Sequence, residues 1–383
     1  DIGTSSAAGV TGATAIGNTS TTTLTLDGTV YTTTGQQTYT AKSGQNIDIT
    51  NTAGTTFTTT NTAVAFNTAG VDLANSATTT VDTGTGAGAV TFQGAIETNG
   101  SDDDVLTITS GTGAVTFSGA IGVTEELGGL NVNASSGNGV ITFSSTIGDT
   151  SGGAGVIGTT AIGNAATSDL NFNAASYSFD GETTITAASG DTIDMGALAA
   201  TSFTTAGDNI TFATGNIELL NGSNLTVDTG AAGGNITIGE IAGHSVETVT
   251  LDAGTGTTSV GVIGTGTEIG ALSIGSSDNG GITLNGAITT DGIVDLDGPI
   301  TLATGAITIT TSDNAINLEG TVDGGQALTL SSGTAKVTAN GAIGSGTALT
   351  SLTVNSAGSG IIEITDIGTS SAAGVTGATA IGN

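Results

Sequence analysis

Hydrophobic and polar residues alternate in a short phrase that recurs along the chain. The phrase reads x-x-[V/I]-T-[F/L]-x-G-A-I with small departures, so Val90 and Phe92 fall on one side of an extended segment and Thr91 on the other. Gly94 follows, where the absence of a Cβ lets the backbone turn a corner. The phrase therefore predicts a strand, a bend and a second strand. Its copies are GAVTFQGAI from Gly88, GAVTFSGAI from Gly113, GVITFSSTI from Gly139, GGITLNGAI from Gly280, NAINLEGTV from Asn314 and AKVTANGAI from Ala335.

The spacing of this phrase predicts a coil. Copies start at 88, 113 and 139 and again at 314 and 335, which are steps of about 20 to 25 residues. Short strands with small-residue corners at such intervals are typical of a parallel β-solenoid, in which each turn of chain stacks on the last. We expect an all-β solenoid with about 20 residues per coil. A β-sandwich or barrel is the structural alternative, and disorder is disfavoured by an apolar content of 36%.

The chain also carries nested repeats. Residues 1–18, DIGTSSAAGVTGATAIGN, return letter for letter as residues 366–383, which defines a period of 365 residues. A shift of 146 residues lays Tyr31 on Tyr177, and a shift of 222 lays residues 106–122 on 328–344. One period would hold about 18 coils, continuous with the next period. The repeats divide the chain into module 1 (1–146), module 2 (147–264), a shortened module 3 (265–365) and the start of the next period (366–383).

We interpret the identical end segments as a cut from a tandem array, with an artificial duplication as the alternative. Related segments inside the chain have drifted apart in sequence, so general low complexity does not explain a perfect match.

Charge and composition exclude several classes of partner. The 33 acidic residues are opposed only by Lys42 and Lys336, which gives a formal charge of −31. Nucleic acid and anionic membrane surfaces are bound through cations, so neither is an expected partner. No apolar run approaches the 18 or more residues of a membrane-spanning helix. The absence of cysteine excludes disulfides and thiolate metal sites.

Three longer phrases resemble a known class of protein. SGTGAVTFSGAIG (110–122), TTTGQQTYTAKSGQNI (32–47) and GTALTSLTVNSAG (346–358) are similar to repeats of filamentous haemagglutinin-like and autotransporter-type bacterial surface proteins. The resemblance covers nearly the whole chain and carries no catalytic signature. It implies a right-handed parallel β-helix that serves as an extracellular, cell-surface shaft or adhesin stalk.

The densest acidic cluster consists of Asp102, Asp103 and Asp104. Calcium takes six to eight oxygen ligands, and three consecutive side chains on an extended chain alternate in direction. We expect a solvated turn here, with a Ca²⁺ site as the weaker alternative and no other metal or cofactor.

A second group of carboxylates, Asp291, Asp295 and Asp297, suggests paired-acid glycoside chemistry, because Asp295 and Asp297 would share one strand face. Such chemistry usually recruits basic residues around the carboxylates, and His244 has no recognisable partner in the sequence. We therefore expect no catalytic residue and no enzymatic activity, with His244 at an exposed corner.

Two hypotheses of surface binding depend on side-chain rows. The threonine runs at 19–26, 55–63 and 306–311 would suit ice binding only as uninterrupted rows, and they are scattered along the sequence. A sugar-binding platform would need exposed aromatic residues, for which Tyr31, Tyr39 and Tyr177 are the candidates. The nine phenylalanines, all at or before Phe212, are expected to fill the core.

These observations lead to one expected function and one alternative. We expect a non-catalytic structural segment of an extracellular filament or stalk built from tandem periods. Its partner would be itself, end to end, through covalent repeats or, less favoured, a non-covalent polymer. The alternative is an adhesin whose shaft binds glycans or cell surfaces.

Overall fold

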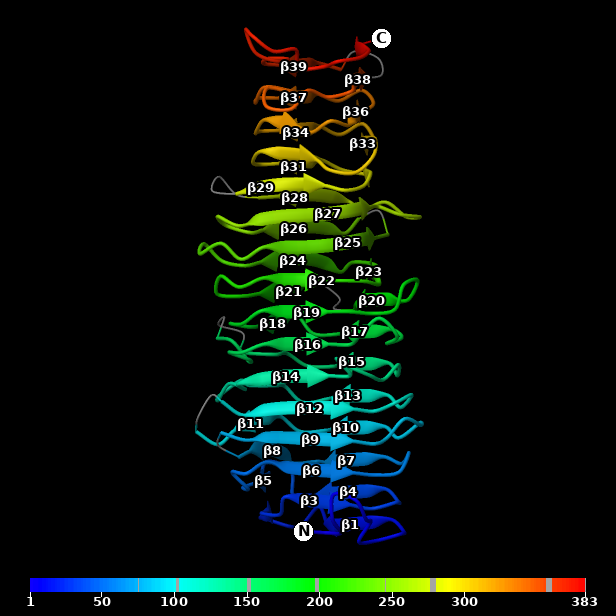
Figure 1. Ribbon diagram of the computed structural model, residues 1–383, viewed down its shortest axis with the longest axis vertical. Coiled ribbons are helices and arrows are strands. Elements are labelled where there is room, and N and C mark those ends of the chain that lie inside the picture. Colours follow the sequence, from blue (N-terminus) through cyan, green and yellow to red (C-terminus); the bar gives the residue numbers. More distant parts are fainter. Residues whose placement is uncertain are drawn as a thin grey trace. The chain divides into compact units, whose positions relative to one another are not determined.

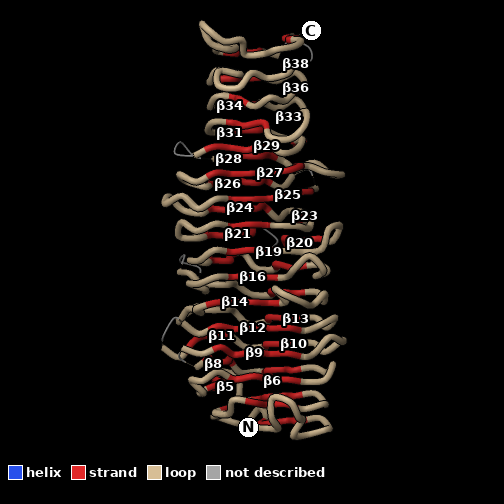
Figure 2. The backbone as a smooth tube through the Cα atoms, viewed as in Figure 1, coloured by secondary structure: helices blue, strands red, loops and turns tan. Residues whose placement is uncertain are grey.

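The described part of the chain consists of strands and connecting loops. A computed structural model describes residues 1–74, 76–100, 103–149, 153–196, 200–244, 246–275, 280–355 and 360–382. Within these ranges there is no helix, and the named strands pair in parallel with their neighbours (Figures 1 and 2). The fold is a parallel β-solenoid of about 15 turns, consistent with a right-handed β-helix, as the sequence predicts.

The chain forms two compact units. The first comprises residues 1–197, 203–205 and 213–215, and the second comprises 198–202, 206–212 and 216–383. The two units are defined by contacts in space, whereas the three modules were defined by sequence similarity. The module boundaries therefore stay a prediction.

The first unit contains the strands β1 (Thr14–Gly17), β2 (Leu24–Leu26), β3 (Val30–Thr32), β4 (Gln37–Thr40), β5 (Asn46–Ile49), β6 (Thr55–Thr58), β7 (Val64–Asn67), β8 (Gly70–Leu73), β9 (Thr78–Asp82), β10 (Val90–Phe92), β11 (Ile96–Thr98), β12 (Val105–Thr109), β13 (Val115–Phe117), β14 (Gly129–Val132), β15 (Ile141–Phe143), β16 (Thr160–Ile162), β17 (Leu170–Phe172), β18 (Ser176–Ser178), β19 (Thr183–Ile185) and β20 (Thr192–Met195). Strand β21 (Ala200–Thr204) has residues in both units.

The second unit contains β22 (Ile210–Phe212), β23 (Asn216–Leu219), β24 (Asn224–Asp228), β25 (Ile236–Ala242), β26 (Thr248–Asp252), β27 (Thr257–Ile263), β28 (Ala271–Ile274), β29 (Gly281–Leu284), β30 (Ile288–Thr290), β31 (Val294–Leu296), β32 (Ile300–Leu302), β33 (Ile307–Thr311), β34 (Ile316–Leu318), β35 (Val322–Asp323), β36 (Ala327–Ser331), β37 (Val337–Ala339), β38 (Ser351–Asn355), β39 (Ile362–Ile364) and β40 (Thr379–Ile381).

Each coil of the first unit contributes to three columns of strands. One column runs β1, β4, β7, β10, β13, β15, β17 and β20, and a second runs β3, β6, β9, β12, β14, β16 and β19 (Figure 1). The third begins with β2, β5, β8 and β11 and continues to Tyr177 through single bridges. The second unit repeats the three-column plan, with the long strands β25 and β27 each pairing in two columns.

Successive copies of the phrase are one coil apart, but the expected mean coil length was too short, so the expected number of coils was too high. Val90 pairs with Val115, and Val115 pairs with Ile141. One of the shortest steps between paired positions runs from Ile282 to Ile300, and one of the longest runs from Leu130 to Thr160. The corners between the strands absorb this variation.

The recurring phrase adopts the predicted geometry. Val90 and Phe92 are buried while Thr91 is half-exposed, and Val90, Val115 and Ile141 pair in register. The corner after the strand has no space for a side chain, because a Cβ on Gly94 would lie 2.0 Å from the carbonyl oxygen of Ala69. Glycine is needed here for close approach of the preceding coil.

Aromatic rings form a continuous stack inside the first unit. Tyr39, Phe66, Phe92, Phe117, Phe143 and Phe172 follow one another, with ring centroids 4.8–5.6 Å apart and planes within 17° of parallel. All nine phenylalanines are buried, which confirms their predicted place in the core. One ring per coil matches the coil spacing closely enough for stacking to continue from strand to strand.

The 146-residue shift connects residues with the same structural role. Tyr31 accepts a hydrogen bond from the N–H of Gly28 at 3.0 Å, and Tyr177 accepts one from Ala174 at 2.9 Å. Tyr31 stacks on Phe57, and Tyr177 stacks on Phe203, each with centroids 5.0 Å apart. The sequence similarity therefore reflects repeated local structure.

Replacing one ring of the stack should weaken the first unit. Phe117 is 1% exposed, and Phe117→Ala should lower the free energy of unfolding by about 3–5 kcal/mol, because it removes buried area and two ring contacts. The neighbouring outward Thr116→Ala should cost less than about 1 kcal/mol. Urea unfolding of both variants measures the difference, and equal losses would contradict the inward stack as a source of stability.

Candidate functional site

Two residues of the predicted acidic cluster, Asp103 and Asp104, lie among the described residues. Asp102 lies outside the described residues. The carboxylate of Asp103 accepts hydrogen bonds from Ser76, at 3.0 Å from the backbone N–H and 2.5 Å from the hydroxyl. Asp104 accepts the N–H of Ala77 at 3.2 Å through Oδ1. Both carboxylates therefore bond to the preceding coil.

Asp104 differs from the solvated residue that the sequence suggested. Its side chain is 0% exposed, and its Oδ2 is buried with no hydrogen-bond partner. Burial raises the pKa of Asp104 to about 6; the charge of Asp103 adds to the rise, and backbone N–H groups, including that of Ala77, oppose it. The residue is thus an internal carboxyl group at the start of β12.

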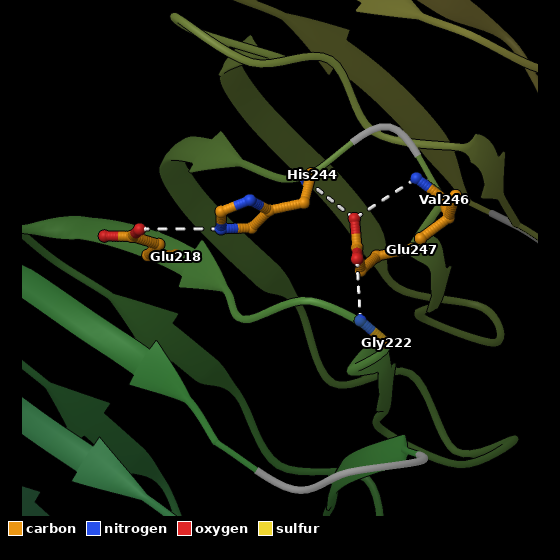
Figure 3. A network of polar contacts seen from close by, with 5 residues as sticks. All are labelled: Glu218, Gly222, His244, Val246 and Glu247. Carbon is orange, nitrogen blue, oxygen red and sulfur yellow. Dashed lines mark hydrogen bonds and ion pairs between the residues drawn. The ribbon is translucent and has the colours of Figure 1, made fainter.

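A buried carboxylate organises the corner that contains His244 (Figure 3). Glu247 is 0% exposed. Its Oε1 accepts the N–H of Gly222 from the preceding coil at 2.8 Å, and its Oε2 accepts those of His244 at 2.6 Å and Val246 at 3.3 Å. Burial alone would raise the pKa of Glu247, but these N–H donors outweigh it and hold the pKa below its usual value. Glu247 therefore ties one coil to the next.

His244 lies at an exposed corner, as the sequence predicts, although it does have a neighbour. Its Nε2 lies 3.9 Å from Oε1 of Glu218, which comes from the preceding coil, and the two side chains are 43% and 39% exposed (Figure 3). A pair so far apart and so exposed contributes little to stability. Sequence reasoning missed this contact because the two partners belong to different coils and lie far apart along the chain.

The second carboxylate group is only partly assembled. Asp295 lies on the outer face of β31, opposite Ser273 and Asn317 of the adjacent coils. Burial raises the pKa of Asp295, the charges of Glu319 and Asp297 raise it further, and a hydrogen bond from Asn317 opposes them.

Asp291 belongs to the exposed corner before β31, where its carbonyl oxygen accepts the side-chain N–H of Asn314 at 2.7 Å. Lys336 bonds to Glu363 at 2.6 Å. Asp295 thus has the carboxylates of Glu319 and Asp297 and the amide of Asn317 as neighbours.

Carboxylates from successive coils also align in a column that sequence reasoning missed. Asp48 pairs in register with Asp72, and Asp72 with Glu97, on the outer face of β5, β8 and β11. Burial raises the pKa of Asp72, a hydrogen bond from Asn46 opposes this, and the charges of Asp48 and Glu97 add to the rise. The nearly equal spacing of the three acids along the chain, one coil length at each step, was the available signal.

Hydroxyl groups are more ordered than the scattered threonine runs suggested. In the second unit Thr211, Thr237, Ser259, Thr283 and Thr301 pair in register along the outer face of β22, β25, β27, β29 and β32. One hydroxyl comes from each coil, so the column crosses five segments of sequence. The structure forms a row where the sequence showed none.

The aromatic platform predicted as an alternative is absent at the three candidate residues. Tyr31, Tyr39 and Tyr177 are 6%, 0% and 0% exposed. Their rings belong to the core, so the sugar-binding hypothesis was wrong for these side chains.

Three further observations concern the described residues. Among the residues that the structure describes, no three His, Cys, Asp or Glu side chains gather as a metal site would require.

A hollow in the first unit is lined by residues that include Asp82, Thr109, Ser136 and Asn138. Oδ1 of Asp82 already accepts the N–H of Gly84 at 2.8 Å. None of the described segments forms a helix of the length and apolar character that crossing a membrane requires.

The chain matches no known family model, no curated protein and no solved structure.

Asp104 should make stability depend on pH. Its folded pKa of about 6 lies above the ordinary value of 3.8, so its contribution is complete below about pH 4 and is lost as the pH rises through about 6. Asp104→Asn should therefore gain stability relative to the natural protein between pH 4 and 6, with a constant difference above that. Urea unfolding across this range measures the effect, with the exposed Asp27→Asn as control; parallel curves for natural protein and variant would contradict it.

Glu247 should protect the backbone of its corner. Glu247→Gln replaces one acceptor oxygen with an N–H₂ group that faces backbone donors, so the amides of Gly222, His244 and Val246 should exchange hydrogen faster. His244→Ala, which keeps the carboxylate, should leave these rates nearly unchanged. Because the folded pKa of Glu247 is lowered, its stabilisation is present above about pH 4.5 and is lost as the pH falls further. Hydrogen exchange that is the same in both variants would contradict this role.

Proposed function

We propose that the chain is a non-catalytic structural segment of an extracellular, cell-surface filament or stalk, built from tandem 365-residue periods. The observation that carries the proposal is that the segment shared by both ends folds at each end as an ordinary coil of the solenoid. Ile2 and Val10 pair with Tyr31 and Thr33 at one end, and Ile367 and Val375 pair with Ile343 and Leu349 at the other. A segment that caps a solenoid would instead differ from its internal coils.

The use of carboxylates supports a structural role. Glu97 accepts the N–H groups of Val123, Thr124 and Glu125 at 3.1–3.3 Å from the next coil, and Asp323 accepts those of Gly346 and Thr347 at 2.7 and 2.9 Å. Such groups hold corners together rather than stand free in a cleft. A carboxylate acting as general acid or base needs access to a substrate proton.

The net charge supports a fibre that stays apart from its neighbours. A formal charge of −31 on one chain favours solubility and resists lateral association. The filamentous haemagglutinin-like resemblance supports the extracellular location and the cell-surface attachment. Divalent cations could bridge the acidic surfaces of neighbouring fibres, and in this proposal they have no structural role along the axis.

Adhesion by the shaft is the second candidate, and the hydroxyl column from Thr211 to Thr301 favours it. A regular row of exposed and half-exposed hydroxyls can donate and accept hydrogen bonds with the hydroxyls of a glycan. Binding of the isolated chain to a glycan array, weakened by Thr237→Val and Thr283→Val, would favour adhesion over a spacer. A blank array would favour the spacer.

The mass of the denatured chain from native material tests the structural proposal. Tandem periods predict a covalent polypeptide whose mass corresponds to many 365-residue periods. The chain contains no cysteine, so disulfides between single-period chains could not produce such a mass. Mass spectrometry or gel electrophoresis in denaturant measures it, with negative-stain microscopy of the same sample to detect fibres. A mass near a single period would contradict covalent tandem repetition.

A further inference from the structure

The two copies of the 18-residue segment adopt the same local conformation. Gly3 and Gly368 have φ of 76° and 79°, and Gly17 and Gly382 have φ of 76° and 79°. The same turn follows in each copy, with Thr4 N–H donating to Ala7 O at 2.8 Å in the first and Thr369 N–H to Ala372 O at 2.9 Å in the second. The segment therefore brings its own shape to both ends.

The copies bond through opposite edges. The first copy faces the coil that follows it, with the bonds Ile2 N–H to Val30 O, Thr32 N–H to Ile2 O, Gly9 N–H to Thr32 O, Thr34 N–H to Val10 O and Thr14 N–H to Gln36 O, all 2.7–3.0 Å. The second copy faces the coil that precedes it, with the bonds Gly368 N–H to Ile343 O, Ile343 N–H to Asp366 O, Leu349 N–H to Gly374 O, Thr376 N–H to Leu349 O and Gly382 N–H to Val354 O, all 2.7–3.0 Å.

The two sets use different backbone groups of the shared sequence. The first copy uses the N–H and C=O of Ile2, the N–H of Gly9, the C=O of Val10 and the N–H of Thr14. In the numbering of the first copy, the second uses the C=O of Asp1, the N–H of Gly3, the C=O of Gly9 and the N–H groups of Thr11 and Gly17. No group appears twice, so one copy can make both sets of bonds at once.

An internal coil of the first unit already does this. Residues 146–164 are the counterpart of the segment: the 146-residue shift lays 9–18 on 155–164, and one extra residue before them places Ile147 and Gly148 on Ile2 and Gly3. This coil bonds to the preceding one through Gly148 N–H to Ile121 O and Gly163 N–H to Val132 O, at 2.8 and 2.7 Å. The same coil bonds to the following one through Ser178 N–H to Ile147 O, Gly155 N–H to Ser178 O and Thr160 N–H to Glu182 O, at 2.8–2.9 Å. These bonds are the equivalents of the two terminal sets, here combined in one coil.

We propose that residues 366–383 are a two-edged junction coil whose second edge pairs with residues 30–40 of another copy of this chain. The inference rests on the proposed tandem shaft and adds its register. Tyr31, Thr33 and Thr38 of the next copy lie over Ile367, Val375 and Ala380, as they lie over Ile2, Val10 and Ala15 within the chain.

Side-chain exposure agrees with an occupied junction. Ile367 and Ile381 are 39% and 47% exposed, although both extend columns whose preceding members, Ile343 and Val354, are fully buried. In the proposed register Tyr31 and Tyr39 of the next copy cover the two isoleucines. Burying apolar surface in this way favours the junction by the hydrophobic effect.

The glycine that ends the shared segment, Gly17 in the first copy and Gly382 in the second, allows a test with matched variants. A Cβ on Gly17 would lie 2.2 Å from Thr40 O, and one on Gly163 would lie 2.1 Å from Thr186 O, whereas one on Gly382 meets nothing within 4 Å. All three have positive φ, so the backbone strain of a substitution is shared. Gly382→Val is therefore tolerated by packing in the isolated chain and blocks the proposed junction.

Cysteine cross-linking of full-length chains tests the register. Ala15 and Thr38 are paired on adjacent parallel strands, whose separation of about 4.8 Å permits a disulfide. An Ala15→Cys, Thr38→Cys double variant should close an internal disulfide and shows that the geometry reacts. For the junction, an Ala380→Cys chain is mixed with a Thr38→Cys chain that also carries Gly17→Val, which loosens its own first copy. We expect a disulfide-linked dimer under mild oxidation, resolved on a non-reducing gel.

The control is the same mixture with Gly382→Val added to the Ala380→Cys chain. This mixture should form no disulfide-linked dimer, and thermal melting should show that the Gly382→Val chain still folds. Absence of the dimer while the internal disulfide forms would overturn the junction, and so would a dimer that Gly382→Val leaves unchanged. These outcomes are separate from the mass of the native polypeptide. A mass of many periods without cross-linking would support the proposed tandem shaft and refute this register. A single-period mass with cross-linking would refute covalent tandem repetition and support the junction.

Discussion

Parallel backbone pairing between successive coils is the interaction on which the rest of the structure depends. A coil bonded on both edges satisfies its own N–H and C=O groups and fixes which of its residues face inward. Val90, Val115 and Ile141 stay in register over three coils, and their phenylalanine neighbours consequently stack. A slip of one residue would move every ring to the outside, so the core and the register enforce each other.

The corners allow this register to survive changes in coil length. The short step from Ile282 to Ile300 and the long step from Leu130 to Thr160 both return the chain to a paired position. The cost is crowding, which is why Gly94 occupies a corner where a Cβ would lie 2.0 Å from a backbone atom of the coil before. The corners therefore vary in length while the strands keep their pattern.

The acidic residues have two opposite effects on stacking. Glu97, Asp323 and Glu247 accept N–H groups from adjacent coils and so join them. Asp48, Asp72 and Glu97 also stand one above another, at a separation shorter than the Debye length of about 8 Å, and therefore repel. Glu97 takes part in both, so a half-buried column of like charge is compatible with pairing between the coils.

The strand phrase, its inward and outward positions, the place of the phenylalanines and the repeat shifts could all be predicted from the amino-acid sequence. These features depend on residues a few positions apart, or on similarity that is read directly along the chain. The spacing of the phrase matched individual coils, such as the step from Val90 to Val115, but the expected mean was too short because other coils, such as the one from Leu130 to Thr160, are longer. The contacts that side chains make across coils, in contrast, followed from the packing in three dimensions. Gln37 is buried, with its amide donating to Tyr31 O and Thr58 O, and Asp104 and Glu247 are buried carboxyl groups with opposite shifts in pKa. Nothing local separates these residues from exposed ones of the same type. Each has at least one partner about one coil away, namely Thr58, Ala77 and Gly222. Because the length of a coil varies along the chain, no constant spacing in the sequence could identify these partners.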